Sequence, residues 1–117
     1  MGTTSDILSR ATKNLIATDI SADCLATAHN RYPHIRFEQL DAFDIRSAMR
    51  LGDHFDKVYI DMSGLSSYRA LLDVIALITM YASVFEPEAI IVKSGSLKQF
   101  AKNCEAWKWH SLPAERE

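Results

Sequence analysis

Three aspartates in this chain each come immediately after a short apolar segment that is predicted to be a strand. They are Asp19, Asp41 and Asp61. In open α/β sheets the ligand crevice lies beyond the carboxyl ends of the strands, where an acid can accept hydrogen bonds from the ribose of a nucleoside. One such acid means little, but the shared placement of three predicts a nucleoside-cofactor site.

These acids need a sheet to hold them together, and the pattern of the chain predicts one. Apolar segments predict strands over residues 15–18, 57–60 and 89–92, and alternating apolar and polar residues predict one over 34–40. Helices are predicted before, between and after the strands: the first is capped by Thr3 and Thr4, the second starts after Ser21, and the others span residues 43–51, 68–84 and 96–104. Strands that alternate with helices indicate an α/β fold with a parallel sheet of about four strands.

The composition fits one small globular domain. The 117 residues are 48% hydrophobic and 24% charged, and their net charge is -2. No cluster of Lys and Arg appears, so a strongly basic nucleic-acid groove is not supported.

Cys24 and Cys104 have no metal-ligand spacing, so no metal site is predicted and a reducing compartment is expected. Residues 1–9 lack the core of a signal peptide and the longest apolar run, 74–85, is too short to span a membrane, so the predicted location is cytoplasmic.

The segments around the acids resemble the motifs of class I S-adenosylmethionine (SAM)-dependent methyltransferases, which have a Rossmann-like three-layer fold with a mostly parallel sheet. Asp19 resembles the acid after the family's second strand, and residues 39–44, 58–63 and 90–94 resemble the motifs at its third, fourth and fifth strands. The resemblance implies that SAM is the cofactor, with its ribose at Asp19 and Ile20 and its adenine at Asp41 and Ala42. Asp44 could take the place of Asp41 or cap the next helix.

The resemblance also implies which residues lie near the transferred methyl group. Gly2 resembles the last glycine of the turn that holds the methionine part of the cofactor. Asp61 resembles the acid that faces the methionine end and the substrate, and Lys93 leaves the adjacent strand end, so these two are the candidate catalytic residues. Ribose 2′-O-methyltransferases of RNA have a similar Asp-Met and Lys arrangement, in which the Lys could deprotonate the hydroxyl. A structural ion pair between Asp61 and Lys93 is the alternative.

The chain departs from the family at both ends. The family's first strand and most of its glycine-rich turn have no counterpart before Gly2, and its sixth and seventh strands have none after residue 104. Residues 1–104 are therefore predicted to be a partial, truncated methyltransferase domain, and residues 105–117, with Trp107 and Trp109, its tail. A missing strand would leave a sheet edge exposed, which a protein partner or a second copy could cover.

Three functions remain open at this point. The first is SAM-dependent methyl transfer to an acceptor that the sequence does not identify, with RNA as a candidate that the charge does not favour. The second is a non-catalytic homologue that acts as a binding or partner module. The third is a nicotinamide dinucleotide enzyme, since an acid after the second strand also binds that ribose. The absence of a glycine fingerprint disfavours this third function.

Overall fold

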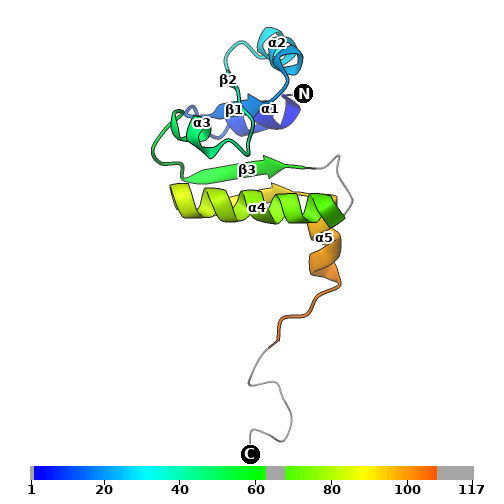
Figure 1. The fold of residues 1–117 in the computed structure, drawn as a ribbon. Helices are drawn as coiled ribbons and strands as arrows, with labels where there is room; N and C mark the ends of the chain where they lie inside the picture. The colour runs from blue at the N-terminus through cyan, green and yellow to red at the C-terminus, as the bar shows by residue number, and fades with distance from the viewer. Residues whose placement is uncertain (1, 63–67, 108–117) are drawn as a thin grey trace, which may run out of the picture. The chain divides into compact units, whose positions relative to one another are not determined.

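The computed structural model describes residues 2–62 and 68–107 (Figure 1). These residues form an α/β structure in which helices alternate with four parallel strands, and this confirms the predicted fold class. The strands lie in two two-stranded sheets. The chain divides into two compact units, Met1–Asp53 and His54–Glu117, and each unit holds one of the sheets.

The first unit is built on a parallel pair, β1 (Ile16–Asp19) and β2 (Arg36–Gln39). Their register runs from Ile16 opposite Arg36 to Asp19 opposite Gln39. The connecting helix α2 (Ala22–Arg31) packs against both strands. Ser21 begins this helix, as predicted, because its side-chain oxygen accepts a hydrogen bond from the Cys24 amide at 3.2 Å. Helices α1 (Thr3–Ser9) and α3 (Ile45–Met49) complete the unit.

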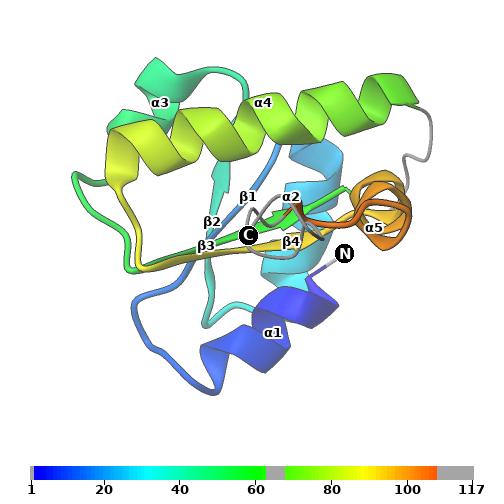
Figure 2. The ribbon, with the colours of Figure 1, turned by 90° about the horizontal axis from the view of Figure 1, so that it is seen from below.

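The second unit repeats the strand–helix–strand arrangement. Strand β3 (Lys57–Asp61) pairs in parallel with β4 (Ala89–Lys93), and α4 (Tyr68–Phe85) connects them. Figure 2 shows β3 and β4 side by side, with α4 running along them. Helix α5 (Gly95–Lys102) follows β4 directly.

One stripe of α4 carries the core of the second unit. The buried residues recur at intervals of three and four, which places them on one side of a helix: Ala70, Val74, Leu77, Tyr81 and Phe85. The ring of Phe85 meets Phe55 edge-on, with ring centroids 5.2 Å apart, and stacks with Tyr81 at 5.7 Å. Apolar side chains are therefore buried along the whole length of α4, and the Phe85 ring ties its end to Phe55, just before β3.

The start of the first helix corrects the sequence prediction. Thr3 and Thr4 lie inside α1 and do not cap it. Gly2 is the N-cap residue, at φ 95°, and no side chain caps this helix end. A Cβ on Gly2 would come within 3.0 Å of the Tyr32 ring, so the helix begins with a residue that packing requires to be small.

Other element ends differ from the prediction by a few residues. Strand β2 begins at Arg36 and not at residue 34, because the Ile35 amide donates to the Tyr32 carbonyl at 3.1 Å in a turn. Helix α3 begins at Ile45 because Asp44 caps it. The last helix, Gly95–Lys102, begins one residue before and ends two residues before the predicted range 96–104.

No helix in the two described ranges is long and apolar enough to cross a bilayer. Trp107, in the predicted tail, is 66% exposed. Trp109 lies outside the described residues.

Candidate functional site

The carboxyl end of the β1–β2 sheet brings two of the predicted acids together. Asp19 is the last residue of β1 and lies opposite Gln39, the last residue of β2. The Leu40 amide donates to the Asp19 carbonyl at 2.9 Å, which extends the ladder one residue further. Asp41 comes next in the chain. The two acids therefore lie at the same end of the same two-stranded sheet.

Asp19 and Asp41 make the same local turn. Oδ1 of Asp19 accepts a hydrogen bond from the Ser21 amide at 2.8 Å, and Oδ1 of Asp41 accepts one from the Phe43 amide at 3.0 Å. Such turns are a common local use of an Asp side chain, which binds the backbone two residues ahead. Within residues 2–62 and 68–107, Oδ2 of each acid has no hydrogen-bond partner. Each carboxylate is thus oriented by the hydrogen bond to Oδ1, and its Oδ2 can accept a hydrogen bond from a bound ligand.

Asp44 is engaged in a different way, and this decides a question that the sequence left open. Its Oδ1 accepts from the Ser47 amide at 3.2 Å and its Oδ2 accepts from the Ser47 hydroxyl at 2.7 Å, so it caps α3 with both oxygens. The hydrogen bond from the Ser47 hydroxyl, followed by that from the Ser47 amide, holds the pKa of the Asp44 carboxyl below its ordinary value. Of the two acids in this loop, Asp41 is the one with an oxygen left for a ligand.

Exposed apolar side chains accompany both site acids. Ile20, directly after Asp19, is 64% exposed, and Phe43, two residues after Asp41, is 46% exposed. Ala42 is half-buried between Asp41 and Phe43 in the chain. Small-molecule sites combine apolar surface with a few polar groups. The exposure of Phe43 shows that it is not part of the core.

Gln39 is a polar residue of this sheet end that the sequence did not single out. Its side-chain nitrogen Nε2 donates to the carbonyl of Ile20 at 3.0 Å, across 19 positions in the chain. The signal that could have revealed it is the strand register, which places Gln39 opposite Asp19. No local pattern specifies that register.

The position of Gly2 has a packing explanation. Its carbonyl accepts from the Asp6 amide at 2.8 Å, which starts α1. A side chain on it would meet the Tyr32 ring at 3.0 Å and the Ala28 side chain at 3.5 Å. The need for glycine here follows from its backbone angle and from these neighbours on α2 and just after it. A role of Gly2 in cofactor binding stays a prediction.

Asp61 and Lys93 lie side by side in the second unit. They are register partners at the carboxyl ends of β3 and β4, and both are exposed. The Met62 amide donates to the Lys93 carbonyl at 2.7 Å, so the pairing continues past the strands. Side chains of paired residues in a parallel sheet leave the same face. In the part of the chain that the structure describes, the Lys93 ammonium makes no ion pair.

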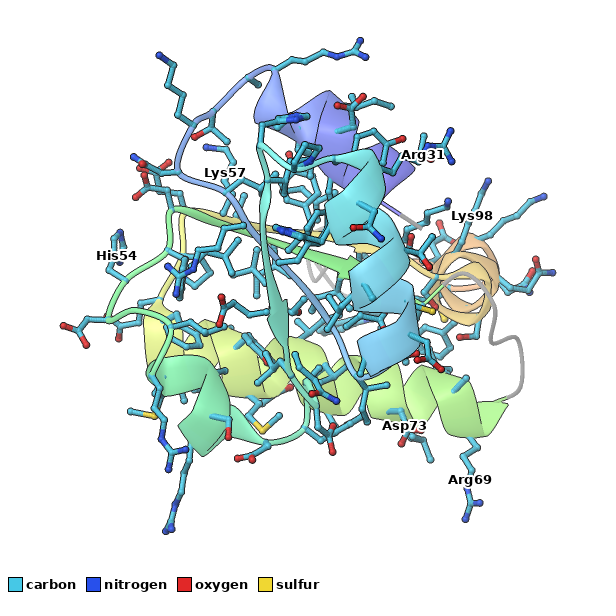
Figure 3. All side chains as sticks on the ribbon, turned by 90° about the horizontal axis from the view of Figure 1, so that it is seen from above. Arg31, His54, Lys57, Arg69, Asp73 and Lys98 are labelled. Carbon is cyan, nitrogen blue, oxygen red and sulfur yellow. The ribbon has the colours of Figure 1, made fainter. Side chains whose placement is uncertain are left out.

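Other basic side chains of the second unit are spread over different elements. Lys57, at the amino end of β3, forms an ion pair with Glu88 at 3.4 Å. Arg69 extends outward from the start of α4 and Lys98 from α5 (Figure 3). This distribution does not favour a basic nucleic-acid groove around Lys93.

A Ser–His–Asp cluster in the first unit lacks the geometry of a catalytic triad. Nε2 of His34 lies 3.5 Å from the Ser9 hydroxyl and also 3.5 Å from Oδ1 of Asp6. A triad needs the serine and the acid on opposite nitrogens of the ring. The cluster instead links α1 to the residues just before β2.

Among residues 2–62 and 68–107, no group of three or more His, Cys, Asp or Glu side chains is arranged to hold a metal ion. Comparisons of the chain with models of known families, with curated proteins and with solved structures found no match.

Proposed function

We propose that this chain is a methyltransferase-type domain that binds SAM by its adenosine half at the carboxyl end of the β1–β2 sheet. One observation carries the proposal: Asp19 and Asp41 lie at the same end of one sheet, and each is oriented through Oδ1 while Oδ2 has no hydrogen-bond partner among the described residues. A nucleoside offers donors that suit two such acceptors, a ribose diol and an exocyclic amine.

The roles of the two acids follow from their chemistry. Asp19 accepts hydrogen bonds from the ribose hydroxyls, as an acid at the end of a parallel strand does in nucleotide-binding sheets. Asp41 accepts from the adenine amine. The exposed side chains of Ile20 and Phe43 offer apolar surface to the ribose and the base. Ala42 and Gly2 are the further cofactor contacts that the family resemblance implies.

Asp61 and Lys93 are the proposed residues of the acceptor side. In methyl transfer, a lone pair of the acceptor forms a bond to the methyl carbon while the carbon–sulfur bond of the sulfonium breaks. The proton of the acceptor then passes to a base, which is the Asp61 carboxylate or Lys93 in its neutral amine form. Most of the rate comes from holding the two reactants in line. The acceptor is unidentified; the charge distribution of the described residues gives RNA no added support.

A binding module without methyl transfer is the second candidate. The observation that favours it is that the two oriented acids belong to the first unit, Met1–Asp53, whereas Asp61 and Lys93 belong to the second. The first unit alone holds the features on which nucleoside binding rests. In either case we place the protein inside the cell, since Cys24 and Cys104 are exposed free thiols, which suit a reducing compartment.

Calorimetric titration of the purified chain with SAM tests the proposal. We expect wild type to bind, and Asp19→Asn to weaken binding by about 10- to 100-fold, because a hydrogen bond to a charged acceptor is lost. Asn can still accept from the Ser21 amide, so the turn is kept. Asp23→Asn, an exposed acid in the first turn of α2, is the matched control and should bind like wild type. Absence of SAM binding by wild type, or full affinity in Asp19→Asn, contradicts the proposal.

A second measurement separates the two candidates. The chain is incubated with SAM that carries a labelled methyl group, together with total RNA or a protein extract. Label in either fraction supports transfer. Binding of SAM with no label in any fraction supports the non-catalytic module.

A further inference from the structure

One peptide unit is held from both sides at the end of β1. The carbonyl of the Ile20–Ser21 peptide accepts a hydrogen bond from Nε2 of Gln39 at 3.0 Å. The N–H of the same peptide donates to Oδ1 of Asp19 at 2.8 Å. The two hydrogen bonds lie in series, so the Gln39 amide is connected to the Asp19 carboxylate through a single planar group.

Gln39 is well placed to hold this peptide still. Its backbone is fixed by the ladder, in which it lies opposite Asp19 and the next amide, that of Leu40, donates to the Asp19 carbonyl at 2.9 Å. Its side chain reaches back across the strand pair to the loop after β1. The turn that orients Asp19 is therefore anchored on β2 as well as on its own short segment.

Loss of the Gln39 hydrogen bond would free the Ile20–Ser21 peptide to rotate. Rotation of the peptide moves the Ser21 N–H away from Oδ1 and releases the carboxylate. Hydrogen bonds in series also polarise one another, so the donor on Ser21 is stronger while Ile20 is bonded to Gln39. Both effects act on the direction in which Oδ2 of Asp19 points.

We infer that Gln39 is a positioning residue, which orients the Asp19 carboxylate for a ribose by way of the Ile20–Ser21 peptide. The inference rests on the proposed function for its ligand. It applies to the ribose end alone, because Asp41 makes its own turn with the Phe43 amide. Gln39 therefore contributes to the recognition of a nucleoside over a free base.

The test compares adenosine with adenine. Gln39→Met keeps the length of the side chain and removes the donor. We expect NMR titrations of the full chain to show adenosine binding weakened about 3- to 10-fold, the usual worth of one neutral hydrogen bond, with adenine binding unchanged. Arg36→Met is the control, an exposed residue at the other end of the same strand, and should leave both affinities as in wild type.

Two outcomes overturn the inference. Equal adenosine affinity in Gln39→Met and wild type means that Gln39 does not act on the site. Equal weakening for adenosine and adenine means a general loss of structure and not a role toward the ribose.

A ligand-free measurement separates this inference from the proposed function. Three-bond couplings report the side-chain rotamer of Asp19, and we expect one rotamer in wild type and averaging in Gln39→Met. If wild type binds neither SAM nor adenosine, the proposed function fails and these couplings alone decide whether Gln39 orients Asp19. Identical couplings in the two proteins would overturn the positioning role.

Discussion

Asp41 and Asp44 lie in one loop, but Ser47 occupies both oxygens of Asp44 whereas the Phe43 amide occupies one oxygen of Asp41. Asp44 thus completes the first turn of α3, and each of its carboxylate oxygens already accepts a hydrogen bond within the protein. Asp41 forms a turn and retains acceptor capacity. The same loop therefore holds one acid with a structural role and one acid that suits a ligand.

Substitution of these two acids should separate their roles. In Asp41→Asn the side-chain oxygen still accepts from the Phe43 amide, but the charge is lost. SAM binding is expected to weaken by about 10-fold, at the lower range for a hydrogen bond to a charged group. Asp44→Asn should bind SAM within a factor of about two of wild type. The lost charge is exposed, so solvent screens its effect on the ligand. Calorimetric titration measures both, and a larger loss in Asp44→Asn than in Asp41→Asn would reverse the assignment.

The stability contributed by Asp44 should depend on pH. Its carboxyl has a lowered pKa in the folded chain, because Ser47 donates two hydrogen bonds to the charged form. A group with a lowered folded pKa stabilises the protein above its unfolded value, here near the ordinary 3.8, and loses that effect as the pH falls through the folded value. Asp44→Asn should therefore have a lower urea midpoint than wild type at pH 7, with a smaller difference at pH 3. An unchanged difference would show that the cap does not depend on the charge.

Several elements could be predicted because their signals are local. Ser21 was identified as a helix cap from its place before an apolar-periodic segment, and its hydroxyl oxygen accepts from the Cys24 amide. The strands follow from short apolar runs at residues 15–18, 57–60 and 89–92 and from the alternation of apolar and polar residues over 34–40. The presence of Asp19 and Asp41 at one sheet end could be predicted as well, since parallel strands present their carboxyl ends together.

The remaining features depend on contacts between distant segments. The start of α1 at Gly2 follows from the Tyr32 ring, which no pattern near residue 2 encodes. The bond from Gln39 to Ile20 needs the register of β1 with β2. Likewise, the division of the four strands into two sheets depends on which strands pair with each other. The spacing of residues in the sequence predicts the order of the strands along the chain, but not which strands pair.

Glu86, at the end of α4, has a backbone conformation that favours glycine. It is the one non-glycine residue with a positive φ, 46°, among the residues that the structure describes, and its amide donates to the Ala82 carbonyl at 3.1 Å. A left-handed residue that ends a helix is usually glycine, because a Cβ there is crowded by the backbone. Glu86→Gly should raise the free energy of unfolding by about 0.5–1 kcal/mol, measured by urea denaturation. Glu86→Ala, which keeps the Cβ, should give no such gain. Equal stabilisation by both would indicate that removal of the charge is the cause.

Gly2 and Gly95 provide a matched pair of glycines at helix starts. A Cβ on Gly2 meets the Tyr32 ring at 3.0 Å and the residue has φ 95°, whereas a Cβ on Gly95 has no atom within 4 Å. Gly2→Ala should lower the free energy of unfolding by about 1–3 kcal/mol, through backbone strain and a displaced ring. Gly95→Ala should leave it unchanged or raise it by up to about 1 kcal/mol, because alanine favours a helix.

The Gly2→Ala variant also tests whether Gly2 contacts the cofactor. Packing against Tyr32 accounts for the glycine without any ligand. If the role of Gly2 is purely structural, Gly2→Ala should bind SAM as wild type does when it is titrated under conditions where it is fully folded. A role in holding the methionine part of SAM predicts weaker binding of SAM with unchanged binding of adenosine, which lacks that part. Comparison of the two ligands by calorimetry distinguishes these cases, because strain transmitted through α2 to Asp19 would weaken both ligands alike.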